Sequence, residues 1–544
     1  MNAVDYRETV KQLVDDIKTI SANAGLGGEA GEYNLVTQTF LYKFLNDKFL
    51  YEAKKINPNY DFKILSELKD DDYHFLLMDI GTNAAHLQKD HLIENLFSKQ
   101  NESDFAKTFD DTLNDIAVNN NDVFSVHTSG NSDIRLFEER LINDIVRDSS
   151  KRNEVAKAII NKLAVIKFDE AIFSAGFDFF STIFEYMIKD YNKDGGGKYA
   201  EYYTPHAIAR VMAEILVAND KPISVKAYDP SAGSGTLLMN LASKIGTDKV
   251  SIYSQDISQK SSNLLRLNLI LNNLSHSINN IVQGNTIIEN RHPEKMDYIV
   301  SNPPFKLDFS DWQSQVFALP ESHERFFAGV PNIPKSAKDK MSIYLLFLQH
   351  IIWSLSDTGK AAIVVPTGFI TAQAGIEKKI RQKLVDNHWL KGVVSMPSNI
   401  FATTGTNVSI LFIDKDNTEK VTLVDASKLG TRVKEGKNQK TLLSRDEEQQ
   451  IIDAFSNLEA QENLSVKLDI NEIKAKNYSF AAGQYFDIKI EYVEITAEEF
   501  DSKMRAHKSA LDALFEEGIK LEIEIMNNLS KLSLNTEVDK YEEG

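Results

Sequence analysis

The residues best suited to chemistry follow a predicted strand, Tyr298–Ser301, and they are Asn302, Pro303, Pro304 and Phe305. An asparagine amide oxygen beside a proline carbonyl offers two hydrogen-bond acceptors to one exocyclic amine. Proline fixes φ and lacks an N–H, so this turn is rigid, and Phe305 supplies a face on which a planar base can stack. A plain strand-terminating turn would tolerate Asn-Pro-Pro but needs no such set of four. The pattern therefore favours a site for an amine carried on a planar ring.

A second stretch, Val225–Met239, reads as a strand, a glycine turn and a helix. Gly233 and Gly235 allow a tight turn and a close approach of the backbone to a ligand. A dinucleotide site would have a third glycine at the position of Leu238, so the stretch argues against NAD. By itself Gly-x-Gly is a weak signal, and the longer run Asp229–Gly235 is the more specific one.

Asp256 lies 21 residues beyond Gly235, after the next predicted strand. Folds of this kind place a carboxylate there to bind a ribose diol. The alternative is that Asp256 caps the helix that begins near Ser258. No Gly-Lys-Ser/Thr follows the glycine turn, and acidic residues stand where phosphates would be repelled. A cationic sulfonium ligand with a ribose and an amino-acid tail suits this site better than a nucleotide.

The elements that must position these residues indicate an α/β fold. Residues 1–190 show helical periodicity, as in Tyr33–Leu45. From Ser224 onward, short β-branched runs alternate with helical segments, which predicts crossover units on a mostly parallel sheet. The last two strands, 392–395 and 408–413, have no helix between them, so we expect a terminal antiparallel pair.

Composition narrows the function classes. The 544 residues carry 61 Lys+Arg and 79 Asp+Glu, a formal charge of −18, which argues against a chain that grips DNA over its whole surface. Zero cysteines exclude a disulfide framework, a thiol nucleophile and sites with cysteine metal ligands. The N-terminus is polar and acidic, and apolar runs fall short of the ~20 residues of a membrane span. We expect a cytoplasmic protein.

The Asn302–Phe305 and Asp229–Gly235 runs resemble those of the N6-adenine DNA methyltransferases, which use S-adenosylmethionine (SAM). Gly197–His206 and Gly284–Thr286 resemble two further elements of that family, although Asn285 stands where aspartate is usual. The resemblance implies a Rossmann-like methyltransferase sheet, and it implies no metal. The catalytic residues that it implies are Asn302, Pro303, Pro304 and Phe305. The cofactor-binding residues that it implies are Glu201, Tyr202, Tyr203, Thr204, Pro205, His206, Asp229, Ser231, Gly233, Ser234, Gly235, Thr236, Asp256 and Asn285.

Three more stretches resemble the modification (M) subunit of type I restriction–modification systems: Tyr33–Asp47, Pro397–Val408 and Gly436–Gln439. This resemblance implies a bacterial or archaeal cytoplasmic protein that acts on double-stranded DNA within a multisubunit complex. Its implied partners are a specificity subunit and possibly a restriction subunit. The expected domains are an α-helical domain (1–190), the SAM-dependent methyltransferase domain (191–415), a mixed extension (416–495) and a helical tail (496–544) for subunit docking.

In the implied reaction, Asn302 and Pro303 accept the two N6 hydrogens of an adenine that has left the duplex, and Phe305 stacks on it. The tail stripe Met504–Leu532, interrupted by Gly518 and Asn528, fits either a helix packed on its own domain or one docked on a partner. Any DNA contacts are expected on the 35-residue connection Lys306–Lys340, which is long enough to be a mobile lid. The alternatives are a solitary adenine methyltransferase, a protein-glutamine or RNA methyltransferase, and a non-catalytic scaffold.

Overall fold

The computed structural model describes residues 3–27, 30–128, 130, 132–168, 170–173, 186, 204–401, 407–435, 438–486 and 496–530. The chain forms two compact units, residues 1–486 and residues 487–544. The helices of the first part of the chain are α1 (Ala3–Asn23), α2 (Ala30–Ile56), α3 (Phe62–Glu67), α4 (Asp70–Ile80), α5 (Ile93–Ser98), α6 (Phe105–Asn119), α7 (Asn121–Phe124), α8 (Leu141–Ile145), α9 (Arg152–Val165) and α10 (Glu170–Phe173).

Helix α2 lies at the centre of this helical region. The helix predicted over Tyr33–Leu45 is present, but it is buried on nearly every side rather than along one stripe, because Val36 and Tyr42 are buried as well as Leu35 and Phe44. Helix α6 is the one that has a distinct apolar stripe: Phe105 and Phe109 face the core, while the opposite side of the helix is mostly polar. The predicted helical region is therefore present, and its apolar faces form one continuous core with the helices that follow it in the chain.

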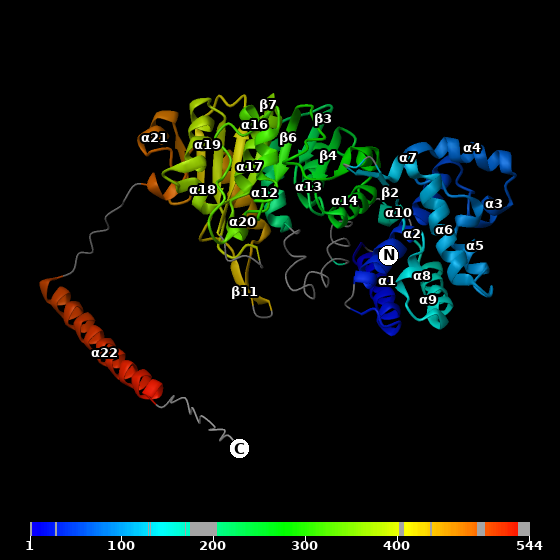
Figure 1. Ribbon diagram of the computed structural model, residues 1–544, viewed down its shortest axis with the longest axis horizontal. Helices are drawn as coiled ribbons and strands as arrows, with labels where there is room; N and C mark the ends of the chain where they lie inside the picture. The colour runs from blue at the N-terminus through cyan, green and yellow to red at the C-terminus, as the bar shows by residue number, and fades with distance from the viewer. Residues whose placement is uncertain are drawn as a thin grey trace, which may run out of the picture. The chain divides into compact units, whose positions relative to one another are not determined.

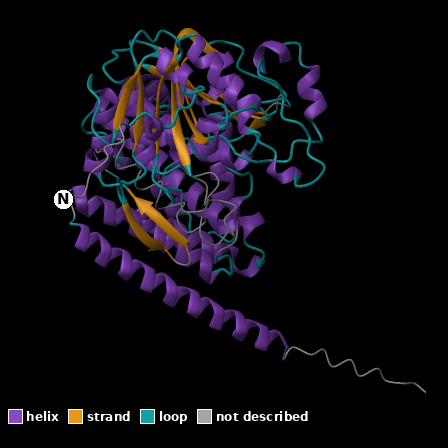
Figure 2. Ribbon diagram, turned by 90° about the vertical axis from the view of Figure 1, so that its left-hand side faces the viewer, coloured by secondary structure: helices purple, strands orange, loops and turns teal. Residues whose placement is uncertain are grey.

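The predicted α/β class is also confirmed. An 11-stranded sheet has the order β13-β10-β8-β9-β7-β6-β3-β4-β5-β1-β2, drawn in orange in Figure 2. Its strands are β1 (Val126–Thr128), β2 (Asp133–Ile134), β3 (Val225–Asp229), β4 (Val250–Asp256), β5 (Ile281–Gln283), β6 (Met296–Ser301), β7 (Leu355–Pro366), β8 (Leu390–Ser395), β9 (Val408–Asp414), β10 (Val421–Asp425) and β13 (Ser465–Leu468). Eight of them run parallel, so their carboxyl ends share one edge of the sheet.

The expected antiparallel pair is β8 and β9, with β9 inserted between β7 and β8. The sheet does not stop at this pair, because β10 and β13 extend it beyond β8. Sequence reasoning assigned these two strands to a mixed extension, since a short strand far along the chain does not reveal its pairing partner.

Helices cover both faces of the sheet (Figure 1). The helices of this part of the chain are α12 (His206–Val217), α13 (Thr236–Ile245), α14 (Gln259–Leu271), α15 (Gln313–Ala318), α16 (Ser322–Arg325), α17 (Tyr344–Ser354), α18 (Thr367–Thr371), α19 (Gly375–Asp386), α20 (Arg445–Ser456) and α21 (Ile470–Ala475). Side chains alternate along a strand. In β7, Ala362 and Val364 accordingly belong to the core shared with α12 and α13, and Ile363 belongs to the core shared with α17 and α19.

The helical region is joined to the sheet by main-chain pairing. Strand β1 runs parallel to β5, with His127 opposite Val282. Behind this junction, the buried guanidinium of Arg266 on α14 donates to the carbonyls of Phe124 (3.2 Å) and Ile134 (2.8 Å). A further bond to the Leu136 carbonyl brings the total to three carbonyls, from two backbone segments, that one side chain holds.

The second unit contains α22 (Ala497–Ser530). The predicted tail helix is confirmed, and it runs unbroken through Gly518 and Asn528, where the sequence suggested interruptions. Large apolar side chains along it, including Leu511, Leu514 and Leu521, are more than half exposed. Among the described residues, no helix has both the length and the apolar character needed to cross a membrane.

Candidate active site

The glycine turn lies at the carboxyl edge of the sheet, between β3 and α13. Gly233 (φ 54°) and Gly235 (φ 82°) both adopt left-handed backbone conformations, which L-residues with a side chain rarely adopt. A Cβ on Gly235 would also lie 2.2 Å from Leu265 Cδ1. The predicted need for glycine is therefore explained twice at Gly235, by its backbone angle and by the close approach of α14.

Asp256 lies at the end of β4 and holds this turn. Its Oδ2 accepts a hydrogen bond from the Gly233 N–H (3.0 Å), and its Oδ1 accepts one from the Ser258 N–H (2.8 Å). Asp256 is not the helix cap that the alternative interpretation supposed, because Ser258 caps α14 through its own hydroxyl. Burial raises the pKa of Asp256, although the two N–H donors oppose the shift.

Asp229, at the end of β3, connects the glycine turn to the strand that precedes Asn302. Its Oδ1 accepts hydrogen bonds from the Ser231 N–H (2.9 Å) and from Ser301 Oγ (2.9 Å). The Ser231 and Ser301 hydroxyls are also 2.9 Å apart. Asp229 is 1 % exposed, and its burial, together with the nearby Asp256 charge, raises its pKa to about 7. Ser301 was missed from the sequence, where it reads as an ordinary strand residue.

Asn302 and Thr204 meet at this edge although they are 98 residues apart in the chain. Asn302 Nδ2 donates to Thr204 Oγ1 at 3.2 Å. This bond commits the donor end of the amide to the protein and leaves Oδ1, an acceptor, for a ligand. Pro303 is buried and Pro304 is exposed. The structure thus gives the two prolines different environments, with Pro303 fixed beside Asn302.

Phe305 lies against a short series of aromatic rings. It makes an edge contact with Tyr344 (centroids 6.3 Å apart, 78°), and Tyr344 makes another with Phe369 (6.4 Å, 86°). These contacts fix the orientation of Phe305, which is half-buried. A ring held at its edge keeps a face available for stacking.

Asn285 follows β5, and its Oδ1 accepts from the Ile287 N–H (3.1 Å). The next residue, Thr286, donates its hydroxyl to the Pro230 carbonyl (2.8 Å), which ties this loop to the glycine turn. From the other side, Arg325 donates to the carbonyls of Thr286 and Ile287. The Asn285 loop is therefore fixed at both of its sides by hydrogen bonds.

Arg325 is fully buried and is oriented by a histidine. Its Nε donates to His350 Nδ1 (3.0 Å), and His350 Nε2 lies 3.1 Å from the Tyr228 hydroxyl. Burial and the Arg325 charge hold the pKa of His350 well below its usual value, so the ring is neutral and accepts at Nδ1. No local sequence signal marks Arg325, which lies in a connection without strong periodicity.

The Lys306–Lys340 connection differs from the expected loose lid. It contains α15 and α16, and its Phe309 and Val316 are buried in a cluster with Ile287. Together with Arg325, these residues pack the connection onto the Asn285 loop.

The remaining predicted residues surround the same turn. Ser234 and Thr236 are buried, with their hydroxyl oxygens 3.2 Å apart. His206 begins α12, directly after Pro205, and its Nδ1 lies 3.3 Å from Asn240 Nδ2 on α13. Glu201, Tyr202 and Tyr203 lie outside the described residues.

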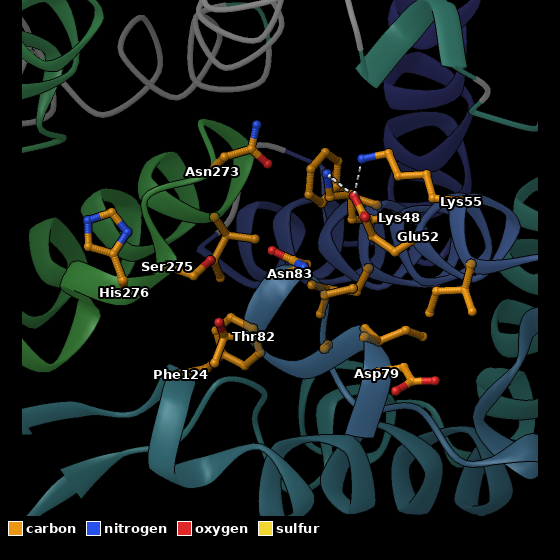
Figure 3. A pocket seen from close by; sticks show the side chains of 17 residues that line it. Lys48, Glu52, Lys55, Asp79, Thr82, Asn83, Phe124, Asn273, Ser275 and His276 are labelled. Atoms are coloured by element: carbon orange, nitrogen blue, oxygen red, sulfur yellow. Dashed lines mark hydrogen bonds and ion pairs between the residues drawn. The ribbon is translucent and has the colours of Figure 1, made fainter. Parts of the chain in front are cut away.

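A cavity of about 620 Å³ lies elsewhere, between α2, the end of α4 and the end of α14 (Figure 3). Within it, Glu52 pairs with both Lys48 (2.9 Å) and Lys55 (3.0 Å). Its sheet-side wall includes Ser275 and His276, which precede β5 and so lie at the amino edge of the sheet. None of the predicted site residues lines this cavity, so the site is defined by the motifs at the opposite edge.

This geometry is that of a class I methyltransferase fold, with a glycine turn and an Asn-Pro-Pro-Phe turn side by side. The N-6 DNA Methylase family profile matches residues 175–492, and the chain belongs to that family. It is an adenine-specific DNA methyltransferase whose cofactor is SAM.

Several proteins of known type are similar to this chain in sequence or in fold. The MpnII methylase subunit of a type I restriction enzyme from Mycoplasma pneumoniae is 27 % identical over 86 % of this chain and 85 % of its own length. The MjaIX methylase subunit from Methanocaldococcus jannaschii is 25 % identical over 73 % and 72 %. A type I methyltransferase subunit from Streptococcus thermophilus shares the fold, with a TM-score of 0.70, 21 % identity, and coverage of 88 % of this chain and all of that one. The predicted resemblance to type I M subunits is confirmed.

The buried Arg325 yields a first prediction. Arg325→Met removes the donors to the Thr286 and Ile287 carbonyls, so the Asn285 loop loses its fixed position. We expect the dissociation constant for SAM, measured by calorimetry, to rise about tenfold, which corresponds to about 1.4 kcal/mol. The methylation rate at saturating SAM should change much less, because Asn302 is untouched.

Arg266→Met is the matched control, since Arg266 is also a buried arginine that donates to backbone carbonyls, but at the junction with the helical region. It should lower the thermal midpoint and leave SAM affinity unchanged. Equal loss of SAM affinity in both variants would show that the effect of Arg325→Met is general destabilisation.

Proposed function

We propose that Asn302, Pro303 and Phe305 bind the target adenine and that the glycine turn, Asp229, Asp256 and Asn285 bind SAM. The observation that carries this assignment is the hydrogen bond from Asn302 to Thr204, which presents the amide oxygen next to the glycine turn. The residues present suit the cofactor: the turn has no Cβ at Gly233 or Gly235, and buried carboxylates complement a cation.

When bound, SAM supplies an electrophilic methyl group on a sulfonium. The N6 amine of adenine is a poor nucleophile because its lone pair is delocalised into the ring. Asn302 Oδ1 and the Pro303 carbonyl accept hydrogen bonds from the two N–H groups of this amine. These bonds favour a pyramidal nitrogen with an available lone pair. Acceptors aimed at developing positive charge stabilise the transition state by a few kcal/mol, by analogy with oxyanion donors.

The adenine must leave the duplex to reach Asn302. Extrusion costs roughly a few kcal/mol of lost stacking and pairing. Stacking on Phe305 offsets part of this cost, and the contact with Tyr344 holds the Phe305 ring in place. Pro304, which is exposed, shapes the turn without a contact of its own to the base.

We further propose that the chain is the M subunit of a cytoplasmic type I complex and takes its sequence specificity from a separate subunit. The names of its relatives support this role, and so does the charge of the chain, −18, which suits a subunit that leaves most of the DNA contacts to a partner. Within its own unit, α22 buries none of its described side chains, and we propose that its apolar side chains dock on a partner. A restriction subunit would complete the system.

Asn302→Ala tests the catalytic assignment. Loss of the oriented acceptor should lower the methylation rate about 10²- to 10³-fold, while calorimetric SAM affinity stays within about twofold. Thr204→Val, which keeps Asn302 but removes its hydroxyl partner, should give a smaller loss of the same kind. Asn417→Ala, in the turn between β9 and β10 at the other edge, is the control. A parallel loss of SAM affinity in Asn302→Ala would contradict a catalytic role.

The pKa of Asp229, about 7, predicts a pH-dependent cofactor affinity. Below this pH the carboxyl is neutral, and above it the carboxylate attracts the sulfonium, so SAM affinity should rise as pH increases through 7. The thioether product, S-adenosylhomocysteine, lacks the positive charge and should show a flatter profile. Asp229→Asn should flatten the SAM profile. An equal pH response for both ligands would exclude this electrostatic origin.

Dependence on a partner tests the subunit assignment. The purified chain should bind SAM yet methylate no defined sequence at physiological salt, and co-expression with a specificity subunit should restore site-specific transfer. Truncation after residue 496 should keep SAM binding, since the described site residues precede it, but should abolish co-purification with that subunit. Methylation of one defined sequence by the chain alone would make it a solitary adenine methyltransferase.

A further inference from the structure

A small two-stranded sheet, separate from the large one, follows β10 in the chain. It consists of β11 (Thr431–Glu435) and β12 (Asn438–Leu442), paired antiparallel. Figure 2 shows this hairpin standing apart from the main sheet. Residues 428–442 carry five Lys/Arg and one Asp/Glu, in a chain whose net charge is −18. The hairpin is thus a local concentration of positive charge on an acidic protein.

The hairpin has a fixed base. The Gly430 N–H donates to Glu447 Oε1 (2.7 Å) on α20, and Thr441 donates its N–H to the Asn399 carbonyl (2.9 Å) and its hydroxyl to the Ser398 carbonyl (2.7 Å). Helix α20 is itself attached to α12 through Arg210 and Glu448, which form a two-pronged ion pair. The base of the hairpin is therefore fixed by hydrogen bonds to α20 and to the loop that follows β8.

Two of its basic side chains, those of Arg432 and Lys434, share a face, whereas Lys440, opposite Val433, lies on the other face. Cross-strand partners lie on the same side of an antiparallel pair, and the pairs here are Arg432 with Thr441 and Lys434 with Gln439. Arg432, Lys434 and Gln439 are exposed, whereas Thr441 is buried against Ser398. Arg432 and Lys434 therefore lie on the same face of the hairpin as Thr441, whose hydroxyl donates to the Ser398 carbonyl. The loop that contains Ser398 follows β8 at the carboxyl edge of the sheet.

The hairpin and Asn302 arise from the same edge of the sheet. Strand β10, which leads into the hairpin, is parallel to β6, which leads into Asn302, and four strand spacings separate them. At about 4.8 Å per spacing this is roughly 19 Å. At about 3.4 Å per base pair, the separation corresponds to roughly five or six base pairs along a duplex.

We infer that the β11–β12 hairpin binds the DNA phosphate backbone about half a helical turn from the target adenine, through Arg432 and Lys434. This inference rests on the proposed function. A two-stranded ribbon matches the width of the DNA major groove, and exposed Arg and Lys are the side chains that contact phosphates.

The Lys306–Lys340 connection, where DNA contacts were expected from the sequence, is less suited. Its residues include five Lys/Arg, one of them the buried Arg325, and five Asp/Glu, so its net charge is zero. A segment without net charge gains little from phosphate binding.

The test compares Arg432→Gln/Lys434→Gln with Lys335→Gln/Lys338→Gln, which removes two exposed lysines from that connection. Binding of the full-length chain to a 30-base-pair duplex of arbitrary sequence is measured by fluorescence anisotropy over a series of salt concentrations. The hairpin variant should bind severalfold more weakly, and its slope of log affinity against log salt should fall by about 2, close to one for each phosphate that the protein no longer neutralises. The control variant should behave as the parent.

A cross-linking experiment gives an independent readout. The chain has no cysteine, so Gln439→Cys introduces a single thiol on the basic face, and Ser427→Cys places one outside it. Only the former should form a disulfide with a duplex that carries a thiol tethered to its backbone. Calorimetric SAM binding by each variant confirms that the catalytic domain is folded.

An unchanged salt slope in the hairpin variant, or an equal loss in the lysine control, would overturn the inference. So would normal DNA binding combined with loss of assembly with the specificity subunit, which would assign the hairpin to protein docking. Failure of the proposed function would give a different result from failure of this inference. If the proposed function is wrong, the parent chain assembled with its specificity subunit transfers no methyl group, even with an intact hairpin.

Discussion

The Asp229 carboxylate lies buried where β3 and β6 end, and the position of the whole site depends on the hydrogen bonds that it accepts. One comes from the backbone of the glycine turn at Ser231, and the other comes from Ser301, the residue before Asn302. The glycine turn and the Asn302–Phe305 turn are therefore held at a fixed separation by a single acidic group. Because burying a carboxylate is costly unless it is hydrogen-bonded, each of these donors stabilises both turns at once.

Several buried arginines perform a related task in the rest of the catalytic region. Arg325 donates to the Asn285 loop, Arg266 to the helical region, and Arg381 to the carbonyls of Phe369, Ala372 and Tyr478. A guanidinium has five N–H donors in a fixed plane, so one side chain satisfies carbonyls from several segments. Loops that have no regular pairing of their own are thus held in one conformation.

Much of the geometry of the candidate site could be predicted because its signals are local. Each of three features indicates a local structure within a few residues: the closely spaced glycines of the turn, an aspartate at a strand end, and the Asn-Pro-Pro-Phe turn. Ser301 and Arg325 could not be found in this way, since their importance comes from contacts with Asp229 and with the Thr286 carbonyl. The same limit applies to the fold: the alternation of strands and helices predicts a parallel sheet, but not that β10 and β13 extend it or that β1 joins its other end.

The pairing of β1 with β5 has a consequence for how the chain can be divided. An uncovered edge strand presents a row of unsatisfied N–H and C=O groups and recruits strands from other molecules. Here β1 covers β5, and the two-residue β2 ends the sheet on that side. The helical region thus shields the methyltransferase sheet from self-association. A fragment trimmed to the catalytic motifs would retain them and still expose an unpaired strand edge. Because the helices before β1 share one core with α8 and α9, a cut at β1 would expose that core as well, so a well-behaved catalytic module keeps the whole helical region.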